Sequence, residues 1–169
     1  MVELLVMRHA KSDWNSGASR DFDRPLADRG HRAAERMAQW LEDQDLQPDR
    51  VVSSSAVRAR ATAAYIVEHL EIADTDVEFR DDLYHADVED WLAVLREQSA
   101  ERILICGHNP GLDWLVEFLA DSSPPETADG KLMTTAAIAH LSFDGGWQSV
   151  SESAGQLQSL VRPRELRPS

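Results

Sequence analysis

The sequence predicts an α/β fold with a mostly parallel central sheet and an antiparallel edge. Two observations predict this class. From residue 2 to about residue 119, short apolar runs alternate with segments whose apolar residues recur at helical spacing. Such alternation is typical of a parallel sheet covered by helices. The last third instead has two apolar runs around an Asp144-Gly145-Gly146 turn, which predicts a hairpin and hence the antiparallel edge.

Six apolar runs are predicted as strands. The first, "VELLVM", is apolar at nearly every position, as expected of a buried strand. In chain order the predicted strands cover residues 2–7, 50–53, 77–79, 102–106, 136–143 and 147–150.

Four segments are predicted as helices from the spacing of their apolar residues. They lie within residues 28–41, 56–70, 88–95 and 110–119. Asp28 is the expected N-cap of the first helix and Ser55 that of the second. Asn109 is expected to cap the fourth, with Pro110 at its first helical position.

The length and composition predict one domain. The chain has 169 residues, of which 43% are hydrophobic and 28% charged, as in an ordinary globular protein. No internal repeat and no linker divides it. We therefore expect a single domain over residues 1–161. Residues 162–169, with two prolines and three arginines, are expected to form a loose C-terminal tail.

Charge and hydropathy exclude several classes of protein. The net charge of −13 argues against a nucleic-acid partner, because phosphate backbones favour clustered lysine and arginine. No apolar run approaches the ~20 residues that span a bilayer. The first apolar run has no basic residue before it, so we do not expect a signal peptide or a membrane partner. Cys106 is the only cysteine, which excludes an intramolecular disulfide and favours a cytoplasmic location.

Cationic or polar residues follow three of the predicted parallel strands. They are Arg8-His9, the segment from Ser53 to Arg58, and Gly107-His108. Because ligands bind at the carboxyl ends of parallel strands, these residues are expected to converge on one crevice. Arg58 and His108 would also lie near helix N-termini, which favour anions. Two arginines and two histidines around such N–H groups indicate a site for a phosphoryl group.

Ordinary structural explanations exist for each of these residues alone. A single arginine at a strand end is usually in a surface ion pair, and a single histidine after glycine is usually a turn residue. Their convergence at three strand ends favours a common site instead. His31, His69 and His140 fit exposed helix or strand positions, and we interpret them as structural. His85 is either part of the site or simply the start of a loop.

No metal or nucleotide motif accompanies these residues. The sequence has no HExxH spacing, no cysteine cluster, no Walker A motif and no GxGxxG motif. We therefore expect a site that uses no metal ion and no cofactor.

Four segments carry a resemblance to a known family. "LLVMRHAKSDW", "DRPLADRG", "SSSAVRARATA" and "ILICGHNPGL" resemble the successive motifs of the histidine phosphatase superfamily, which also contains the phosphoglycerate mutases. They are most similar to its short SixA-type branch, the phosphohistidine phosphatases. The resemblance implies a three-layer α/β/α sandwich and a hydrolase that works through a phosphohistidine intermediate.

The resemblance also implies roles for individual residues. His9 matches the histidine that becomes phosphorylated, while Arg8, Arg58 and His108 match the remaining members of the phosphate pocket. Asn15 matches an asparagine that contacts phosphate. In the implied mechanism a neutral His9 attacks phosphorus, and Arg8, Arg58 and a protonated His108 stabilise the charge on its oxygens.

The sequence departs from the family pattern in two ways. The usual Arg-His-Gly is Arg-His-Ala here, a change common in the SixA-type branch. The carboxylic acid that many members use as proton donor has no clear counterpart. Near its expected place the sequence offers His85, which we expect to contact the substrate, and three carboxylates: Asp81, Asp82 and Asp87.

The expected substrate is phosphohistidine in a phosphorylated protein, such as a His-containing phosphocarrier domain, or else a small phosphorylated molecule. Two alternatives stay open. One is a small-molecule phosphomonoesterase of the same superfamily. The other is a non-catalytic phosphoprotein-binding module, which the presence of the nucleophile His9 disfavours. A mutase is disfavoured because the chain is too short for the insertions that mutases carry.

Overall fold

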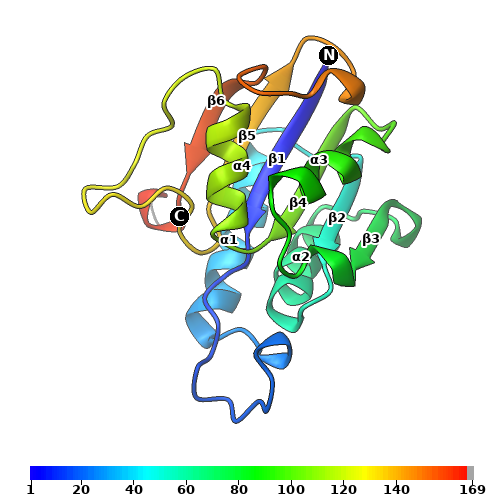
Figure 1. The fold of residues 1–169 in the computed structure, drawn as a ribbon. Helices are drawn as coiled ribbons and strands as arrows, with labels where there is room; N and C mark the ends of the chain where they lie inside the picture. Colours follow the sequence, from blue (N-terminus) through cyan, green and yellow to red (C-terminus); the bar gives the residue numbers. More distant parts are fainter. Residues whose placement is uncertain (167–169) are drawn as a thin grey trace.

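A six-stranded sheet with the order β3-β2-β4-β1-β5-β6 runs through the computed structural model, which describes residues 1–166 (Figure 1). The strands are β1 (Val2–Arg8), β2 (Arg50–Ser54), β3 (Val77–Arg80), β4 (Arg102–Gly107), β5 (Ile138–Phe143) and β6 (Gln156–Val161). The pairs β1–β4, β4–β2 and β2–β3 are parallel, whereas β1–β5 and β5–β6 are antiparallel. The predicted mostly parallel sheet with an antiparallel edge is confirmed.

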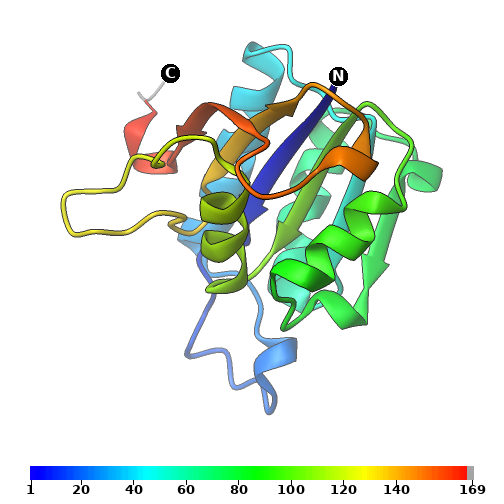
Figure 2. The same cartoon turned by 45° about the horizontal axis from the view of Figure 1, so that its top comes forward.

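Helices cover both faces of this sheet (Figures 1 and 2). They are α1 (Asp28–Asp43), α2 (Val57–His69), α3 (Val88–Arg96) and α4 (Gly111–Leu119). Leu5 and Met7 of β1 belong to the core that contains α1 and α2, while Leu4 and Val6 belong to the core that contains α3 and α4. Both faces of β1 are therefore buried, which explains its continuous apolar sequence and confirms the three-layer α/β/α sandwich.

The starts of α1 and α2 differ from the predictions. α1 includes Asp28 as its first residue, so Asp28 is not its N-cap. α2 begins at Val57, which places Ser55 outside the N-cap position. The Ser55 hydroxyl donates a hydrogen bond to the Asp81 carboxylate instead. Ser55, which the local sequence pattern predicted as the N-cap, is thus bonded to a residue far along the chain instead.

α4 begins one residue later than predicted. Pro110 is the residue before the helix, and Gly111 is its first residue. Asn109 nevertheless serves the helix start, because its Oδ1 accepts the N–H of Asp113 at 3.1 Å. Its amide nitrogen also donates to the carbonyl of Met133 at 2.9 Å, which ties this turn to the segment before β5.

The prediction of a sixth strand over residues 147–150 is wrong. Residues 147–149 form a 3-10 helix rather than a strand. The indole N–H of Trp147 donates to the carbonyl of Ala100 at 2.6 Å, and its buried ring joins the core beside α3, which holds this segment outside the sheet. β6 pairs with β5 in its place. Its sequence, "QLQSLV", is half polar and gives only a weak strand signal, as edge strands often do.

The expected loose tail over residues 162–169 is wrong for residues 162–166. Arg162 is buried, and its guanidinium donates to the carbonyls of Leu132 and Pro125 and to the carboxylate of Glu165. Leu166 packs against the core of α1 and α2. The remaining tail, residues 167–169, lies outside the described residues.

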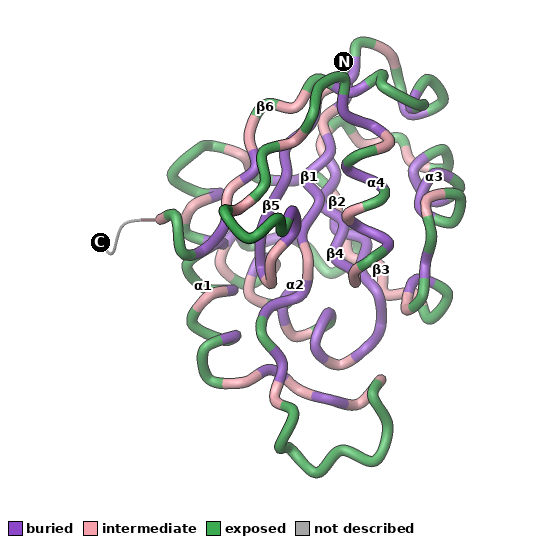
Figure 3. The backbone as a smooth tube through the Cα atoms, turned by 60° about the vertical axis from the view of Figure 1, so that its left-hand side comes forward, coloured by how far each residue is buried: buried purple, intermediate pink, exposed green. Residues whose placement is uncertain are grey.

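Burial is highest in the central sheet, whereas the tip of the loop between β1 and α1 is exposed (Figure 3). Residues 14–21 of this loop are exposed. In Figure 1 the loop extends from the end of the sheet at which β1, β2 and β4 finish. Residues 1–166 contain no helix that is long and apolar enough to cross a membrane.

Candidate active site

Strand register brings the predicted site residues together at the carboxyl ends of the parallel strands. Arg8 at the end of β1 is paired with Gly107 at the end of β4, and Ser53 near the end of β2 is paired with Cys106. The N–H of His9 donates to the Gly107 carbonyl at 3.0 Å. His9 and His108 therefore follow neighbouring strands at the same height, and their ring centroids lie 5.1 Å apart.

His9 is buried and held in one orientation. Its Nδ1 lies 2.8 Å from the carbonyl oxygen of Ala10. Because a carbonyl only accepts hydrogen bonds, Nδ1 carries the proton and Nε2 carries the free electron pair. The Ala10 N–H in turn donates to Thr62 Oγ1 at 2.9 Å, and the Thr62 hydroxyl donates to the Arg58 carbonyl at 2.7 Å. This chain of bonds links the imidazole to the start of α2.

Burial is the main cause that lowers the pKa of His9 from 6.5 to about 3. The hydrogen bond to Ala10 acts in the opposite direction, and electrostatic repulsion from His108, Arg8 and Arg58 adds to the effect of burial. The imidazole is therefore neutral near pH 7. Arg58 Nε lies 3.4 Å from His9 Nε2 and donates toward it. A neutral imidazole with a free electron pair beside a guanidinium has the properties of a nucleophile for an anionic electrophile.

Arg58 lies in the first turn of α2, where its own charge is unfavourable to the helix. Its side chain is buried and turned toward the β1–α1 loop. Nη1 donates to the Asp21 carbonyl at 2.7 Å and Nη2 to the Asp21 carboxylate at 2.8 Å. The guanidinium thus has an anionic partner from the loop while its Nε faces His9.

Arg8 and His108 each present a buried nitrogen without a partner. Arg8 donates from Nη1 to the Met133 carbonyl at 3.0 Å, whereas its Nε has no hydrogen-bond partner among the described residues. His108 Nε2 lies 2.9 Å from Ser54 Oγ, and its buried Nδ1 is likewise unpartnered there. Leaving such groups unsatisfied is costly, so two of them in one cluster indicate a ligand that supplies their partners.

The protonation of His108 differs from the expectation. Burial, followed by the charge of Arg58, lowers the pKa of His108 to about 3. His108 is therefore neutral near pH 7 in the free pocket and not protonated as the implied mechanism assumes. A bound anion would favour its protonated form, because an opposite charge nearby raises a histidine pKa.

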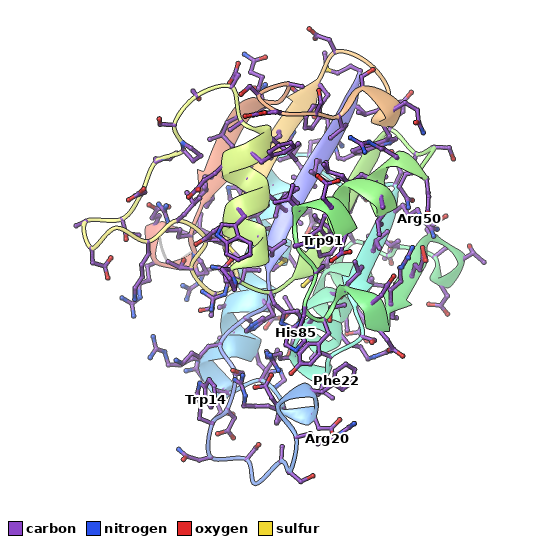
Figure 4. All side chains as sticks on the ribbon, viewed as in Figure 1. Trp14, Arg20, Phe22, Arg50, His85 and Trp91 are labelled. Atoms are coloured by element: carbon purple, nitrogen blue, oxygen red, sulfur yellow. The ribbon has the colours of Figure 1, made fainter. Side chains whose placement is uncertain are left out.

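The two remaining predicted residues lie in different places. Asn15 is exposed in the β1–α1 loop, its own N–H bonds to Asp13 at 2.9 Å, and no side-chain contact joins it to the four residues described above. The structure does not bring it into the cluster. His85 is exposed at the rim, where its ring lies 4.0 Å from that of Tyr84. Figure 4 places it at the same end of the sheet as Phe22 of the loop.

Sequence reasoning missed two residues of this site. Asp21 bonds to Arg58, and the hydroxyl of Tyr84 donates to the Asp21 carboxylate. The Tyr84 ring lies 5.3 Å from that of His108 and so belongs to the same cluster. The spacing of Asp21 and Arg24, three residues apart, indicates an ion pair between those two. No local pattern links Asp21 to Arg58, which is 37 residues away.

Within residues 1–166, no group of three or more histidine, cysteine, aspartate or glutamate side chains is placed to hold a metal ion. The positive charge at the carboxyl ends of these strands comes from arginine.

Comparisons with known proteins identify the family. The sequence profile of the histidine phosphatase superfamily (branch 1) matches residues 4–94, more than half of the chain. This chain belongs to the histidine phosphatase superfamily. The matched segment contains His9, Arg8 and Arg58, and the fold continues beyond it through the strand that precedes His108.

The relatives narrow this assignment. The phosphohistidine phosphatase SixA of Escherichia coli is 28% identical over 146 residues, covering 85% of this chain and 86% of that protein. An uncharacterised protein of Mycobacterium tuberculosis is 32% identical over 164 residues, covering 94% of this chain and all of that protein. A solved structure of the protein histidine phosphatase SixA with tungstate aligns with a TM-score of 0.80 at 26% identity, covering 98% of this chain and all of that one. The resemblance to the SixA branch is thus confirmed, and it supports phosphatase activity that uses a histidine.

Proposed function

We propose that the chain is a phosphohistidine phosphatase in which His9 is the nucleophile and Arg8, Arg58 and His108 bind the phosphoryl group. The observation that supports this most directly is the state of His9. Its imidazole is neutral, its Nδ1 is fixed by the Ala10 carbonyl, and its Nε2 lies 3.4 Å from Arg58 Nε. The unpartnered Arg8 Nε would donate to a phosphoryl oxygen, and so would a His108 protonated on binding.

The proposed reaction has two steps. In the first, His9 Nε2 attacks phosphorus, and the bond from phosphorus to the leaving group breaks on the opposite side, so that its electron pair leaves with that group. In the second, water attacks phosphorus and the electron pair of the broken P–N bond returns to His9 Nε2. Inorganic phosphate and a proton are released. Arg8 and Arg58 stabilise the oxygens in both steps.

The carboxylates near the pocket rim support a preference for phosphohistidine. Asp81 accepts a hydrogen bond from Ser55. Asp82 pairs with Arg80 at 2.8 Å, and Asp87 caps α3. None of the three is therefore placed as a free proton donor. An alkyl phosphate releases an alkoxide and normally needs such a donor.

Phosphohistidine needs no such donor, because its leaving group is an imidazole with a reference pKa of about 6.5. When it is protonated on the far nitrogen, it leaves as a neutral ring. We propose that the substrate is a phosphorylated protein, and that the site works without a metal ion because arginines and N–H groups supply its positive charge.

The test is kcat/KM for a phosphohistidine peptide, p-nitrophenyl phosphate and phosphoserine, measured in chelator with wild type and His85→Ala. We expect phosphohistidine to be fastest, the aryl phosphate intermediate and phosphoserine slowest. Vanadate, which mimics five-coordinate phosphorus, should inhibit. If phosphoserine or sugar phosphates are fastest and His85→Ala abolishes that activity, His85 is the acid and the chain is a small-molecule phosphomonoesterase. Loss of activity in chelator with rescue by added metal would contradict metal independence.

A further inference from the structure

Asp21 binds three side chains of the pocket at once. It is the first residue of a short 3-10 helix, η1 (Asp21–Asp23), within the β1–α1 loop. Its Oδ1 accepts from Arg24 Nη2 at 2.8 Å. Its Oδ2 accepts from Arg58 Nη2 at 2.8 Å and from the Tyr84 hydroxyl. Three side-chain partners are many for a carboxylate that is half exposed.

Asp21 binds only one part of the Arg58 guanidinium. A guanidinium has five N–H donors, arranged along an end formed by Nη1 and Nη2 and a side formed by Nε and Nη2. Asp21 binds the end, through its carbonyl on Nη1 at 2.7 Å and its carboxylate on Nη2. The side carries no carboxylate, and its Nε donates toward His9 Nε2 at 3.4 Å. Through the Nε hydrogen and the second Nη2 hydrogen, that side can donate to two phosphoryl oxygens next to the nucleophile.

We propose that Asp21 is a positioning residue, which turns the Nε and Nη2 side of the Arg58 guanidinium toward the phosphoryl group under attack by His9. This inference rests on the proposed function. It assigns Asp21 no contact with the substrate, because the residue acts through Arg58.

The carboxylate is suited to this role because it is itself held firmly. Arg24 is buried, donates from Nη1 to the Ser12 hydroxyl, and stacks on the Trp14 ring with its guanidinium carbon 3.6 Å from the ring centroid. Arg24 also keeps Oδ1 occupied, so that Oδ2 alone serves Arg58 and Tyr84. The loop thus contains its own support for Asp21.

Asp21 acts as an anion and not as a proton donor. The hydrogen bond from Tyr84, followed by that from Arg24, holds the pKa of the Asp21 carboxyl well below its usual range. The group is therefore ionised at every pH at which the enzyme would be assayed. Its negative charge also weakens the attraction of the pocket for anions, so its removal should affect substrate binding and turnover in opposite directions.

Asp21→Asn tests the proposal, with Asp23→Asn as the matched control. Asp23 lies in the same 3-10 helix, and its partner is the exposed Arg20 at 2.9 Å. Both substitutions remove one negative charge from the loop. We expect Asp21→Asn to lower kcat by about 10-fold to 10²-fold, because a misplaced catalytic group has an effect of that order. Its Kd for inorganic phosphate should stay equal or fall, and Asp23→Asn should match wild type in kcat.

Orthovanadate binding separates this inference from the proposed function. By calorimetry, Asp21→Asn should bind orthovanadate at least about 10-fold more weakly than wild type, because a transition-state mimic depends on correct placement of Arg58. This measurement stands even if wild type hydrolyses none of the chosen substrates, a result that would overturn the proposed function alone. Unchanged or higher kcat with unchanged vanadate affinity would overturn the positioning role and mark Asp21 as a competing anion. Parallel losses in kcat, phosphate affinity and thermal stability would mark it as merely structural.

Discussion

The two ends of strand β1 each gather arginine and histidine, yet they differ in their counter-ions. At the amino end, Glu3 accepts from Arg102 Nη2 at 2.7 Å and lies 2.9 Å from His140 Nε2. At the carboxyl end, no carboxylate among the described residues forms a salt bridge with Arg8, His9 or His108. Asp21 binds Arg58, and the charge of Asp113 acts on Arg8 without such a bridge. Where the chain supplies the counter-ion, the cluster is structural. Where it supplies too few, we infer that a ligand supplies the missing charge.

The pKa values follow the same division. Although burial acts to raise it, hydrogen bonds and charges from His140 and Arg102 leave the pKa of Glu3 below its usual value. At the other end, burial lowers the pKa of both His9 and His108 to about 3. The amino end is thus stabilised in its charged form, whereas the carboxyl end keeps its histidines neutral until an anion arrives.

The sharpest test of this comparison exchanges one histidine at each end for alanine. His9→Ala should reduce kcat by on the order of 10⁶-fold, as expected when a covalent nucleophile is removed. His140→Ala should leave kcat within about 2-fold, because His140 is paired with Leu5 in the middle of β1 and its ring nitrogen binds Glu3, away from the cluster around His9. The measurement is single-turnover kinetics with labelled substrate, quenched rapidly.

The same experiment identifies the intermediate. Wild type and His140→Ala should give a protein adduct that is stable in alkali and labile in acid, and His9→Ala should give none. An adduct on another residue, or full activity of His9→Ala, would show that catalysis does not take place at the carboxyl end of β1.

A smaller effect is expected when one arginine at each end is replaced. Arg58→Ala should reduce turnover by about 10²-fold to 10³-fold, the usual effect of losing one charge-stabilising contact. Its thermal stability without phosphate should change little, because Asp21 keeps Arg24 and Tyr84 as partners. Arg102→Ala should do the reverse, leaving turnover intact while costing roughly 1.5–3 kcal/mol of stability through its lost bonds to Glu3.

Melting curves and kcat measured on the same two variants check this prediction. If Arg58→Ala melts far below wild type while Arg102→Ala loses activity, the two ends of β1 have been assigned the wrong way round.

Sequence patterns predicted the fold well where burial is strong. β1 and β4 are buried on both faces, so their apolar runs stand out, and the helices show clear apolar stripes. β6 was missed because its sequence is half polar and its apolar residues, Leu157, Leu160 and Val161, do not alternate regularly with polar ones. Arg162 was assigned to a loose tail because only the tertiary structure brings the carbonyls of Leu132 and Pro125 to its guanidinium.

The site shows the same limit. Residues next to strand ends were placed correctly, since strand order and register alone bring His9 and His108 together. Asn15 was expected in the pocket, but its position depends on the path of a long loop. The pairing of Asp21 with Arg58 depends on the same loop and was not foreseen. The neutral state of His108 follows from its burial, which no local pattern reveals.

The smallest expected effect is a difference in acid sensitivity between the two ends. With folded-state pKa values of about 3 against an ordinary value of 6.5, His9 and His108 bind protons in the unfolded chain but not in the folded one. The free energy of unfolding should therefore fall as the pH drops below 6.5, by up to about 1.4 kcal/mol per pH unit for each histidine. Glu3 works in a lower window, because a lowered carboxyl pKa removes stability only below the unfolded value of 4.5. Urea unfolding between pH 6.5 and 5 should thus show a slope that His9→Gln reduces and Glu3→Gln does not. Saturating inorganic phosphate should also reduce it, since a bound anion lets the pocket histidines accept protons. A slope that disappears in Glu3→Gln but persists in His9→Gln would show that the acid sensitivity arises at the amino end of β1.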